Sequence, residues 1–515
     1  MLLSDTLEQV LAEPQCALIW HRLLELWRKP NEEVAQQQIL QKLLSSVLSD
    51  HKAEILRLTF LAAATEDNRF VENAALQTLC ISPSNPDRLA GFMAYAWGFA
   101  LKNQVSRESF VATLVRFMLP DLAARLARSA DSLLPDNLPP RLPQTIERIA
   151  VIAPYLGNEF HTPSSMVTNQ CEVLAREGKR VHVFSCQELL SPDMTLFSGS
   201  TDRVLLAPFE IPYWQHALPS GTKLTCSDNT FSLAKRWREM FSLIAAFDPD
   251  AILFCGLYSP LAAALYSRRP VVGLNVHALP PMSPVDVWLS SDDPSAPDNP
   301  WNNIFGTPKN YFHPYRIKSM QGPWSISRAD LGIADDAIIW ITVGGRLESE
   351  ITDPWAKRIG EVLNHNPQVI WLLVGGPGHL PATLSHLPTN RIKLLAKRND
   401  IGGLLQLSDI YVNPPRMGGG YSVAEAMSVA LPVVSFADCD GGDKVGAYAA
   451  RDTDDYLVRL SELTENPDLR KQIGEELLER FTRRLDLASS GPSLLAAFDK
   501  AKRCAQDRLC QTSLD

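Results

Sequence analysis

Residues 411–437 read Tyr-Val-Asn-Pro-Pro-Arg-Met-Gly-Gly-Gly-Tyr-Ser-Val-Ala-Glu-Ala-Met-Ser-Val-Ala-Leu-Pro-Val-Val-Ser-Phe-Ala. This order predicts a short buried strand at 410–412, a glycine bend, a helix over about 422–429 and a second buried strand from Pro432. The bend consists of Gly418, Gly419 and Gly420. Because glycines have no Cβ, backbone N–H groups can approach a ligand closely, and the helix N-terminus adds partial positive charge. Such a bend is typical of a phosphate-binding site.

An acidic side chain lies one turn into the predicted helix. Glu425 can face the same ligand as the glycine bend, and a carboxylate is better suited to a sugar hydroxyl than to a phosphate. Tyr421 and Ser422 would line the sugar and phosphate side, and Ser422 is equally suited to be the helix N-cap. Arg416, just before the bend, is a candidate for a phosphate contact. The stretch therefore predicts a pocket for a sugar nucleotide.

The run Met-Gly-Gly-Gly-Tyr-Ser-Val-Ala-Glu-Ala-Met, followed by Leu-Pro-Val-Val, resembles the donor-site signature of retaining GT-B glycosyltransferases. That family carries two glutamates with seven residues between them. Here the second glutamate is Glu425, but the first position holds Met417, and Ala430 replaces the family's glycine before Pro-Val-Val. The resemblance implies a GT-B fold over about 147–515. It also implies metal-independent sugar transfer from a nucleotide-diphosphate donor, with Glu425 binding the ribose hydroxyls.

The composition limits the class of protein. The 515 residues, 45% hydrophobic, are enough for several units with apolar cores. A net charge of −9 argues against nucleic acid as a partner and gives no reason to expect strong binding to anionic lipid, while a local basic patch for peripheral membrane contact stays open. The 9 cysteines are dispersed, and the N-terminus lacks the basic start and apolar run of a signal peptide. We therefore expect a cytoplasmic protein with reduced thiols, and neither a metal nor a cofactor.

The pattern of apolar residues changes once along the chain. Residues 1–138 are predicted to form an all-helical domain, because apolar positions recur at spacings of three and four. A proline-rich linker follows. Beyond it, apolar β-branched runs alternate with helical segments, which is typical of parallel sheets covered on both faces. We predict the α/β class with two Rossmann-like domains, an acceptor domain at 147–325 and a donor domain at 326–490. By the resemblance, 491–515 is a helix crossing back onto the acceptor domain.

Donor-binding residues are expected at the carboxyl ends of strands. One predicted strand ends at Gly344, Gly345 and Arg346, where the glycines allow close approach and the arginine can hold phosphate oxygens bidentately. The next predicted strand ends near Gly376.

A cation is missing from the expected place. The resembled family usually carries a lysine a few residues after the arginine, but the chain reads Arg-Leu-Glu-Ser-Glu-Ile-Thr from Arg346. Lys397 or Arg398, on a neighbouring loop, would supply the missing charge. The alternative is that both are ordinary solvated side chains.

The acceptor wall is expected after the first strand of the acceptor domain, in Tyr-Leu-Gly-Asn-Glu-Phe-His-Thr-Pro-Ser-Ser from Tyr155. His161 is the candidate there for a polar contact or a base. The neighbouring Thr162, Ser164 and Ser165 equally fit a helix-capping cluster. His277 occupies an equivalent place after a later strand. The candidate catalytic residues are therefore His161, Arg346 and Glu425.

The leading hypothesis is a glycosyltransferase with a UDP-type donor and a glycan, lipid-linked or protein acceptor. An added helical domain is also similar to that of bacterial cytoplasmic protein glycosyltransferases. A non-catalytic GT-B partner stays open because of Met417 and the missing lysine, and 1–138 would then bind a protein partner or a second copy. A sugar-nucleotide epimerase would share the fold.

Overall fold

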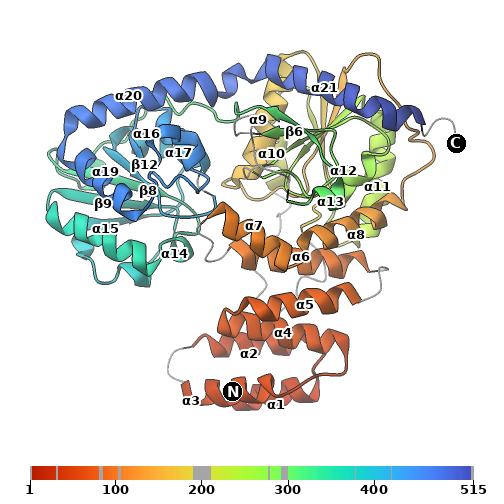
Figure 1. Cartoon of the computed structure of the whole chain (residues 1–515), viewed down its shortest axis with the longest axis horizontal. Coiled ribbons are helices and arrows are strands. Elements are labelled where there is room, and N and C mark those ends of the chain that lie inside the picture. Colours follow the sequence, from red (N-terminus) through yellow and green to blue (C-terminus); the bar gives the residue numbers. More distant parts are fainter. Residues whose placement is uncertain are drawn as a thin grey trace.

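The computed structural model describes residues 3–29, 33–80, 85–101, 106–189, 210–275, 279–290, 300–376, 378–418 and 420–511. Its first part, the helical region, lies below the rest of the molecule in Figure 1. Capping side chains begin two of its helices: Asp50 accepts from Ala53 N at the start of α4, and Ser106 accepts from Ser109 N at the start of α7. Helices α1 to α8 span Leu3–Ala12, Ala17–Trp27, Glu33–Leu44, His51–Thr65, Asn68–Cys80, Pro86–Leu101, Arg107–Arg116 and Leu119–Asp131.

The first lobe is a parallel sheet between helices. Its described strands follow the order β3-β2-β1-β4-β5-β6-β7, and each pairs in parallel with its neighbours. The central strands are buried on both faces, which explains their continuous apolar sequence. Strands β1 to β7 span Arg148–Ile152, Arg180–Ser185, Lys223–Cys226, Ala251–Cys255, Val271–Leu274, Val287–Ser290 and Lys309–Phe312. Helices α9 to α13 span Thr162–Arg176, Glu210–Ala217, Leu233–Phe247, Pro260–Leu265 and Asn302–Phe305.

The second lobe repeats this plan with the strand order β10-β9-β8-β11-β12, again parallel. Strands β8 to β12 span Ile338–Val343, Val369–Val374, Ile392–Leu395, Ile410–Val412 and Val433–Val434. Helices α14 to α20 span Leu347–Glu350, Asp353–His365, Ile401–Leu407, Gly420–Met427, Gly442–Val445, Thr453–Glu465 and Pro467–Arg484. Helix α20 lies along the second lobe, and α21 (Ser490–Gln511) continues over the first lobe (Figure 1).

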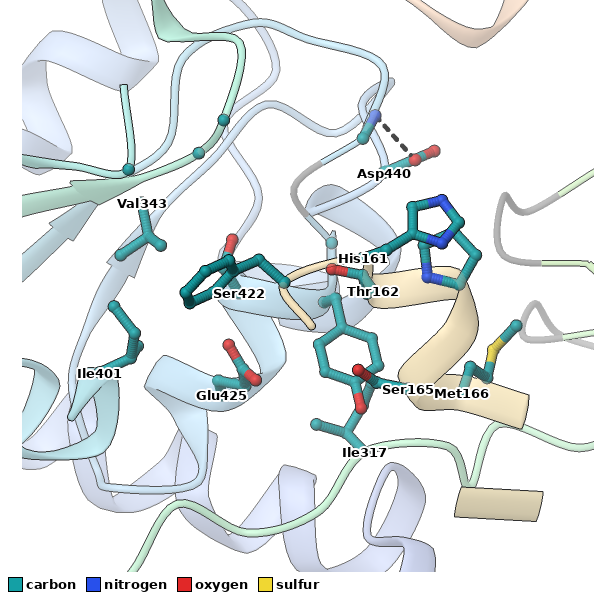
Figure 2. A pocket seen from close by; sticks show the side chains of 18 of the residues that line it. His161, Thr162, Ser165, Met166, Ile317, Val343, Ile401, Ser422, Glu425 and Asp440 are labelled. Atoms are coloured by element: carbon teal, nitrogen blue, oxygen red, sulfur yellow. Dashed lines mark hydrogen bonds between the residues drawn. The ribbon is translucent and has the colours of Figure 1, made fainter. Parts of the chain in front are cut away.

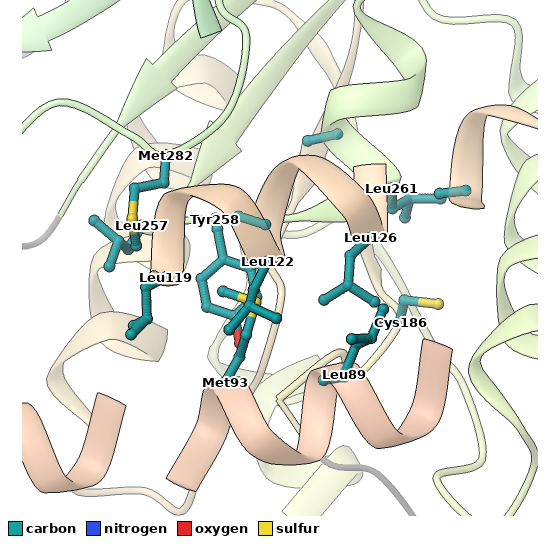
Figure 3. Close-up of a cluster of buried hydrophobic side chains, with 14 of the residues drawn as sticks. Leu89, Met93, Leu119, Leu122, Leu126, Cys186, Leu257, Tyr258, Leu261 and Met282 are labelled. Atoms are coloured by element: carbon teal, nitrogen blue, oxygen red, sulfur yellow. The ribbon is translucent and has the colours of Figure 1, made fainter. Parts of the chain in front are cut away.

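The apolar core of the helical region is continuous with that of the first lobe. Leu119, Leu122 and Leu126 of α8 lie in one buried cluster with Tyr258 and Leu261 of the first lobe (Figure 3). Helices α1 to α4 form a separate cluster around Trp20 and Phe60. The helical region is therefore joined to the first lobe by a packed interface rather than by the linker alone.

The predicted fold class is confirmed: an all-helical region precedes two parallel-sheet α/β lobes. Strands β3, β6 and β7 were not predicted. Each is only four residues long, and the half-buried sequences Lys-Leu-Thr-Cys and Lys-Asn-Tyr-Phe of β3 and β7 lie at the two edges of the sheet, so they lack a continuous apolar run. No helix among the described residues is both long and apolar enough to cross a membrane.

Candidate active site

A cavity of about 680 Å³ lies between the two lobes, at the carboxyl ends of their strands. One wall is the segment after β1 and the start of α9, including His161 and Met166. The opposite wall comes from the ends of β8, β9 and β10 and from α17 (Figure 2). Trp97 and Leu101 of α6 also line it, so the helical region reaches the same cavity.

Most of the residues that the sequence singles out line this cavity. Gly376 does not line the cavity; the neighbouring Gly375 does, and a Cβ on Gly376 would lie 3.5 Å from the Leu347 side chain. Gly419 and His277 lie outside the described residues. The predicted residues that line the cavity are His161 from the first lobe and Gly344, Gly345, Arg346, Arg398, Arg416, Gly418, Gly420, Tyr421, Ser422 and Glu425 from the second.

Glu425 presents its carboxylate to the cavity from the second turn of α17 (Figure 2). Burial raises the pKa of this carboxyl to about 8. Its side chain has no hydrogen-bond or ion-pair partner within the described ranges. A carboxyl group in this state gains from a ligand that offers hydroxyl donors.

Arg346 and Arg416 share one carboxylate. Glu350 Oε1 lies 2.7 Å from Arg346 Nη2, and Glu350 Oε2 lies 2.7 Å from Arg416 Nη1. Burial opposes ionisation of Glu350, but the two guanidinium groups outweigh it and hold the pKa of this carboxyl below its ordinary value. The Arg346 side chain is 47% exposed, so it remains accessible to a ligand.

Arg416, which the sequence suggests as a phosphate contact, lines the cavity but is bonded mainly within the protein. Its side chain is 2% exposed, and besides Glu350 it donates to Asn413 Oδ1 at 3.0 Å and to Val343 O at 2.9 Å. All its nitrogens have partners in the protein, so its role here is to hold Glu350 and the end of β8.

The two neighbouring cations differ in their pairing. Arg398 donates to both oxygens of Asp400, at 2.7 and 2.5 Å, which uses up much of its capacity for a phosphate. Lys397 has no ion-pair partner among the residues described, and its ammonium group lies 5.8 Å from the centre of the Phe160 ring across the cavity. Lys397 also lies beside Gly345, where a Cβ would be 3.9 Å from Lys397 Cε. Of the two, Lys397 is the better placed to replace the missing family lysine.

The glycine bend differs from its prediction. The N–H of Gly418, expected to face a phosphate, donates to Asp440 Oδ2 at 2.8 Å (Figure 2). Gly418 has φ +108°, and a Cβ there would lie 2.7 Å from Arg346 Nη2, so both its conformation and its contact with Arg346 require glycine. Helix α17 begins at Gly420, so Ser422 lies within its first turn and is not the N-cap. Tyr411 OH donates to Ser422 Oγ at 2.7 Å.

Met417 points away from the cavity wall. It is 2% exposed and belongs to the apolar cluster formed by α6, α8 and the first lobe. Its carbonyl oxygen accepts from Arg346 Nη2 at 3.0 Å.

On the facing wall, His161 precedes α9 without capping it through its side chain. Its Nδ1 lies 2.7 Å from Ser164 Oγ, which also accepts from Gly157 N at 2.9 Å. A Cβ on Gly157 would lie 2.6 Å from His161 Cγ, so glycine is required for this packing. The imidazole is therefore fixed at the cavity by its own loop.

One hydrogen bond joins the two walls directly. Asn169 Nδ2, on α9 of the first lobe, donates to the hydroxyl oxygen of Tyr421, on α17 of the second, at 2.8 Å. Asn169, Glu350, Asp440 and Trp97 were all missed by sequence reasoning, and only the carboxylates of Glu350 and Asp440, close to glycine-rich segments, offered a signal. No group of three or more His, Cys, Asp or Glu in the described part of the chain is arranged to hold a metal ion.

Comparison with known proteins agrees with the two-lobed fold described above. Residues 341–466 match the family model of glycosyl transferases group 1. No curated protein matches the sequence. Among solved structures, a variant of the Thermobaculum terrenum O-GlcNAc transferase is similar at 15% identity, with a TM-score of 0.52, covering 99% of this chain and 99% of that chain. The structure of Anabaena Alr3699/HepE in complex with UDP has 15% identity and a TM-score of 0.50, covering 69% of this chain and 100% of that chain.

The two facing parallel-sheet lobes thus form a GT-B fold. The second lobe contains the segment that matches the model of glycosyl transferases group 1, and the chain is a glycosyltransferase.

Proposed function

We propose that this enzyme transfers a sugar from a nucleoside-diphosphate donor, of UDP type, to a glycan, lipid-linked or protein acceptor without a metal ion. The observation that carries the proposal is the carboxyl of Glu425 on the wall of the interlobe cavity, which no described residue hydrogen-bonds or pairs with and whose pKa is raised to about 8. A ribose offers the hydroxyl donors that this group lacks.

The leaving diphosphate lies toward the cationic side of the cavity. Gly344 and Gly345 follow β8 and lie beside Arg346 and Lys397, and all four residues line the wall. Positive charge fixed there stabilises the negative charge that develops on the diphosphate as the glycosidic bond breaks. Positioning supplies the rest, because the facing wall holds the acceptor next to the sugar.

His161 contacts the transferred sugar or the acceptor in this proposal. The imidazole lines the cavity, and its Nδ1 lies 2.7 Å from Ser164 Oγ, which holds the ring at the wall that faces the donor site. Retention of anomeric configuration follows the family resemblance. Inversion would follow if His161 acted as the base that activates the acceptor.

Two substitutions test the donor site. Glu425→Ala and Arg346→Ala should each weaken UDP binding by about tenfold or more, measured by calorimetry and by the shift in melting temperature with UDP. Glu348→Ala, an exposed acid on the same short helix as Glu350 and away from the cavity wall, is the matched control. UDP binding that survives both substitutions unchanged would remove the proposed donor site.

The acceptor class needs a separate experiment. The protein is incubated with a panel of UDP sugars and with glycan, lipid-linked or peptide acceptors, and transfer is followed by mass spectrometry. Peptides come first, because the fold similarity to an O-GlcNAc transferase extends over the helical region. Conversion of the donor alone into an epimer would instead indicate an epimerase.

A further inference from the structure

The carboxylate of Asp440 contacts the glycine bend, although Asp440 lies outside the motif. We propose that Asp440 binds a hydroxyl group of the donor sugar, taking over the corner of the site where the motif has Met417 in place of an acid. The assignment rests on the proposed function and adds the residue that recognises the sugar.

Asp440 reaches the cavity from a different segment. It follows β12, is 7% exposed and lines the cavity, and its Oδ2 accepts from Gly418 N at 2.8 Å, next to Met417 in the chain. A carboxylate can accept about four hydrogen bonds, so it can accept one from a hydroxyl group in addition to those it makes within the protein.

The loop that carries Asp440 is held tightly. A Cβ on Gly441 would lie 2.6 Å from Ser435 Oγ, and one on Gly442 would lie 2.3 Å from Phe436 O. A Cβ on Gly420 would lie 2.5 Å from the backbone oxygen of Asp440 itself. Close packing of this kind fixes the carboxylate relative to the start of α17, as recognition of one hydroxyl requires.

The charges around the bend determine what each side can bind. Two groups of opposite charge bind consecutive backbone groups of the bend. Arg346 Nη2 donates to Met417 O, and Asp440 Oδ2 accepts from Gly418 N. The cation attracts phosphate, whereas the carboxylate repels it and accepts from hydroxyl groups. With the ribose assigned to Glu425, the sugar is the part of the donor that remains for Asp440.

The test compares two affinities in the same protein. Affinities for UDP and for the tighter of UDP-glucose and UDP-N-acetylglucosamine are measured by calorimetry for wild type and for Asp440→Asn. We expect Asp440→Asn to weaken binding of the UDP sugar by about tenfold or more while UDP changes by less than about threefold, because only the sugar contact is lost. Asp438→Asn removes the same charge from an exposed position on the same loop, away from the cavity wall, and should leave both affinities unchanged.

An equal loss of both affinities would show that Asp440 only shapes the bend, and no loss would show that it has no role; either result overturns the proposal. If Asp440→Asn does not fold, deoxy analogues of the same UDP sugar are measured on the wild-type protein. A loss of less than about twofold for every deoxy position then excludes recognition of any hydroxyl by this site. If the wild-type protein binds neither UDP nor a UDP sugar, the proposed donor site itself is wrong. This outcome differs from a variant in which the ratio of the two affinities is unchanged.

Discussion

At the scale of single residues, Glu425 is the most informative side chain of the candidate site. Its position one turn into α17 follows from sequence, but its ionisation does not. Burial raises the pKa of its carboxyl to about 8, because no charged partner within the described residues offsets the loss of water. At neutral pH the native protein therefore keeps a proton that the unfolded chain releases.

This difference predicts a dependence of stability on pH. Between the ordinary value of 4.5 and about 8, the native state binds more protons than the unfolded state, so Glu425 makes stability fall as pH rises through this window. The slope from one group is at most about 1.4 kcal/mol per pH unit. Glu425→Gln should remove this loss, so its melting temperature relative to wild type should rise between pH 5 and pH 8. A constant difference across that range would show that the carboxyl titrates normally.

At the scale of elements, the apolar packing between the helices of the helical region and the first lobe determines which side chain fits at the position of Met417. The side chain is 2% exposed, inside the apolar cluster that joins these helices to the first lobe. An acid there would be buried against apolar groups instead of facing a donor sugar. The departure from the family motif and the presence of the helical region are thus parts of one packing arrangement.

Restoring the family acid should consequently damage the protein. Met417→Glu should cost about 3–5 kcal/mol of unfolding free energy, because a carboxyl in an apolar site must be desolvated or protonated. Met417→Leu, which conserves volume, should cost less than about 1.5 kcal/mol. Urea unfolding of the three proteins measures both. Wild-type stability in Met417→Glu, with faster sugar transfer, would contradict the burial of this position.

At the scale of the whole molecule, several contacts join the two lobes around the cavity. Asn169 on α9 donates to Tyr421 on α17, and Lys318, on the segment that connects the two lobes, lies 2.5 Å from Glu172 of α9. The helical region adds a third connection, since Arg107 N donates to Asp438 O of the second lobe at 3.2 Å. The cavity is therefore lined by three parts of the chain that are far apart in sequence.

The direct bond between the walls can be tested by a double-mutant cycle. Asn169→Ala and Tyr421→Phe should each lower the melting temperature, and the double variant should lower it little beyond the larger single effect. The expected coupling is about 0.5–1.5 kcal/mol, the usual contribution of one hydrogen bond. Fully additive effects would mean that the two walls are not coupled through this bond.

The sequence by itself determined the fold class and pointed to the segments that line the candidate site. Apolar runs of period two or 3.6, interrupted by glycine and proline, are local patterns, so they predicted the helical region, most strands and the order of the two lobes. The same local signals located the turn at Gly344, the glycine bend and Glu425.

Only the tertiary structure decided the partners of these groups. Arg416 resembles a phosphate ligand in sequence, but Glu350 and Asn413 bind it inside the wall. The Gly418 N–H, expected to face a phosphate, is bound by Asp440 from another loop. The physical reason is that hydrogen bonding and burial depend on distances between residues far apart in the chain, which a local pattern of residue types does not contain.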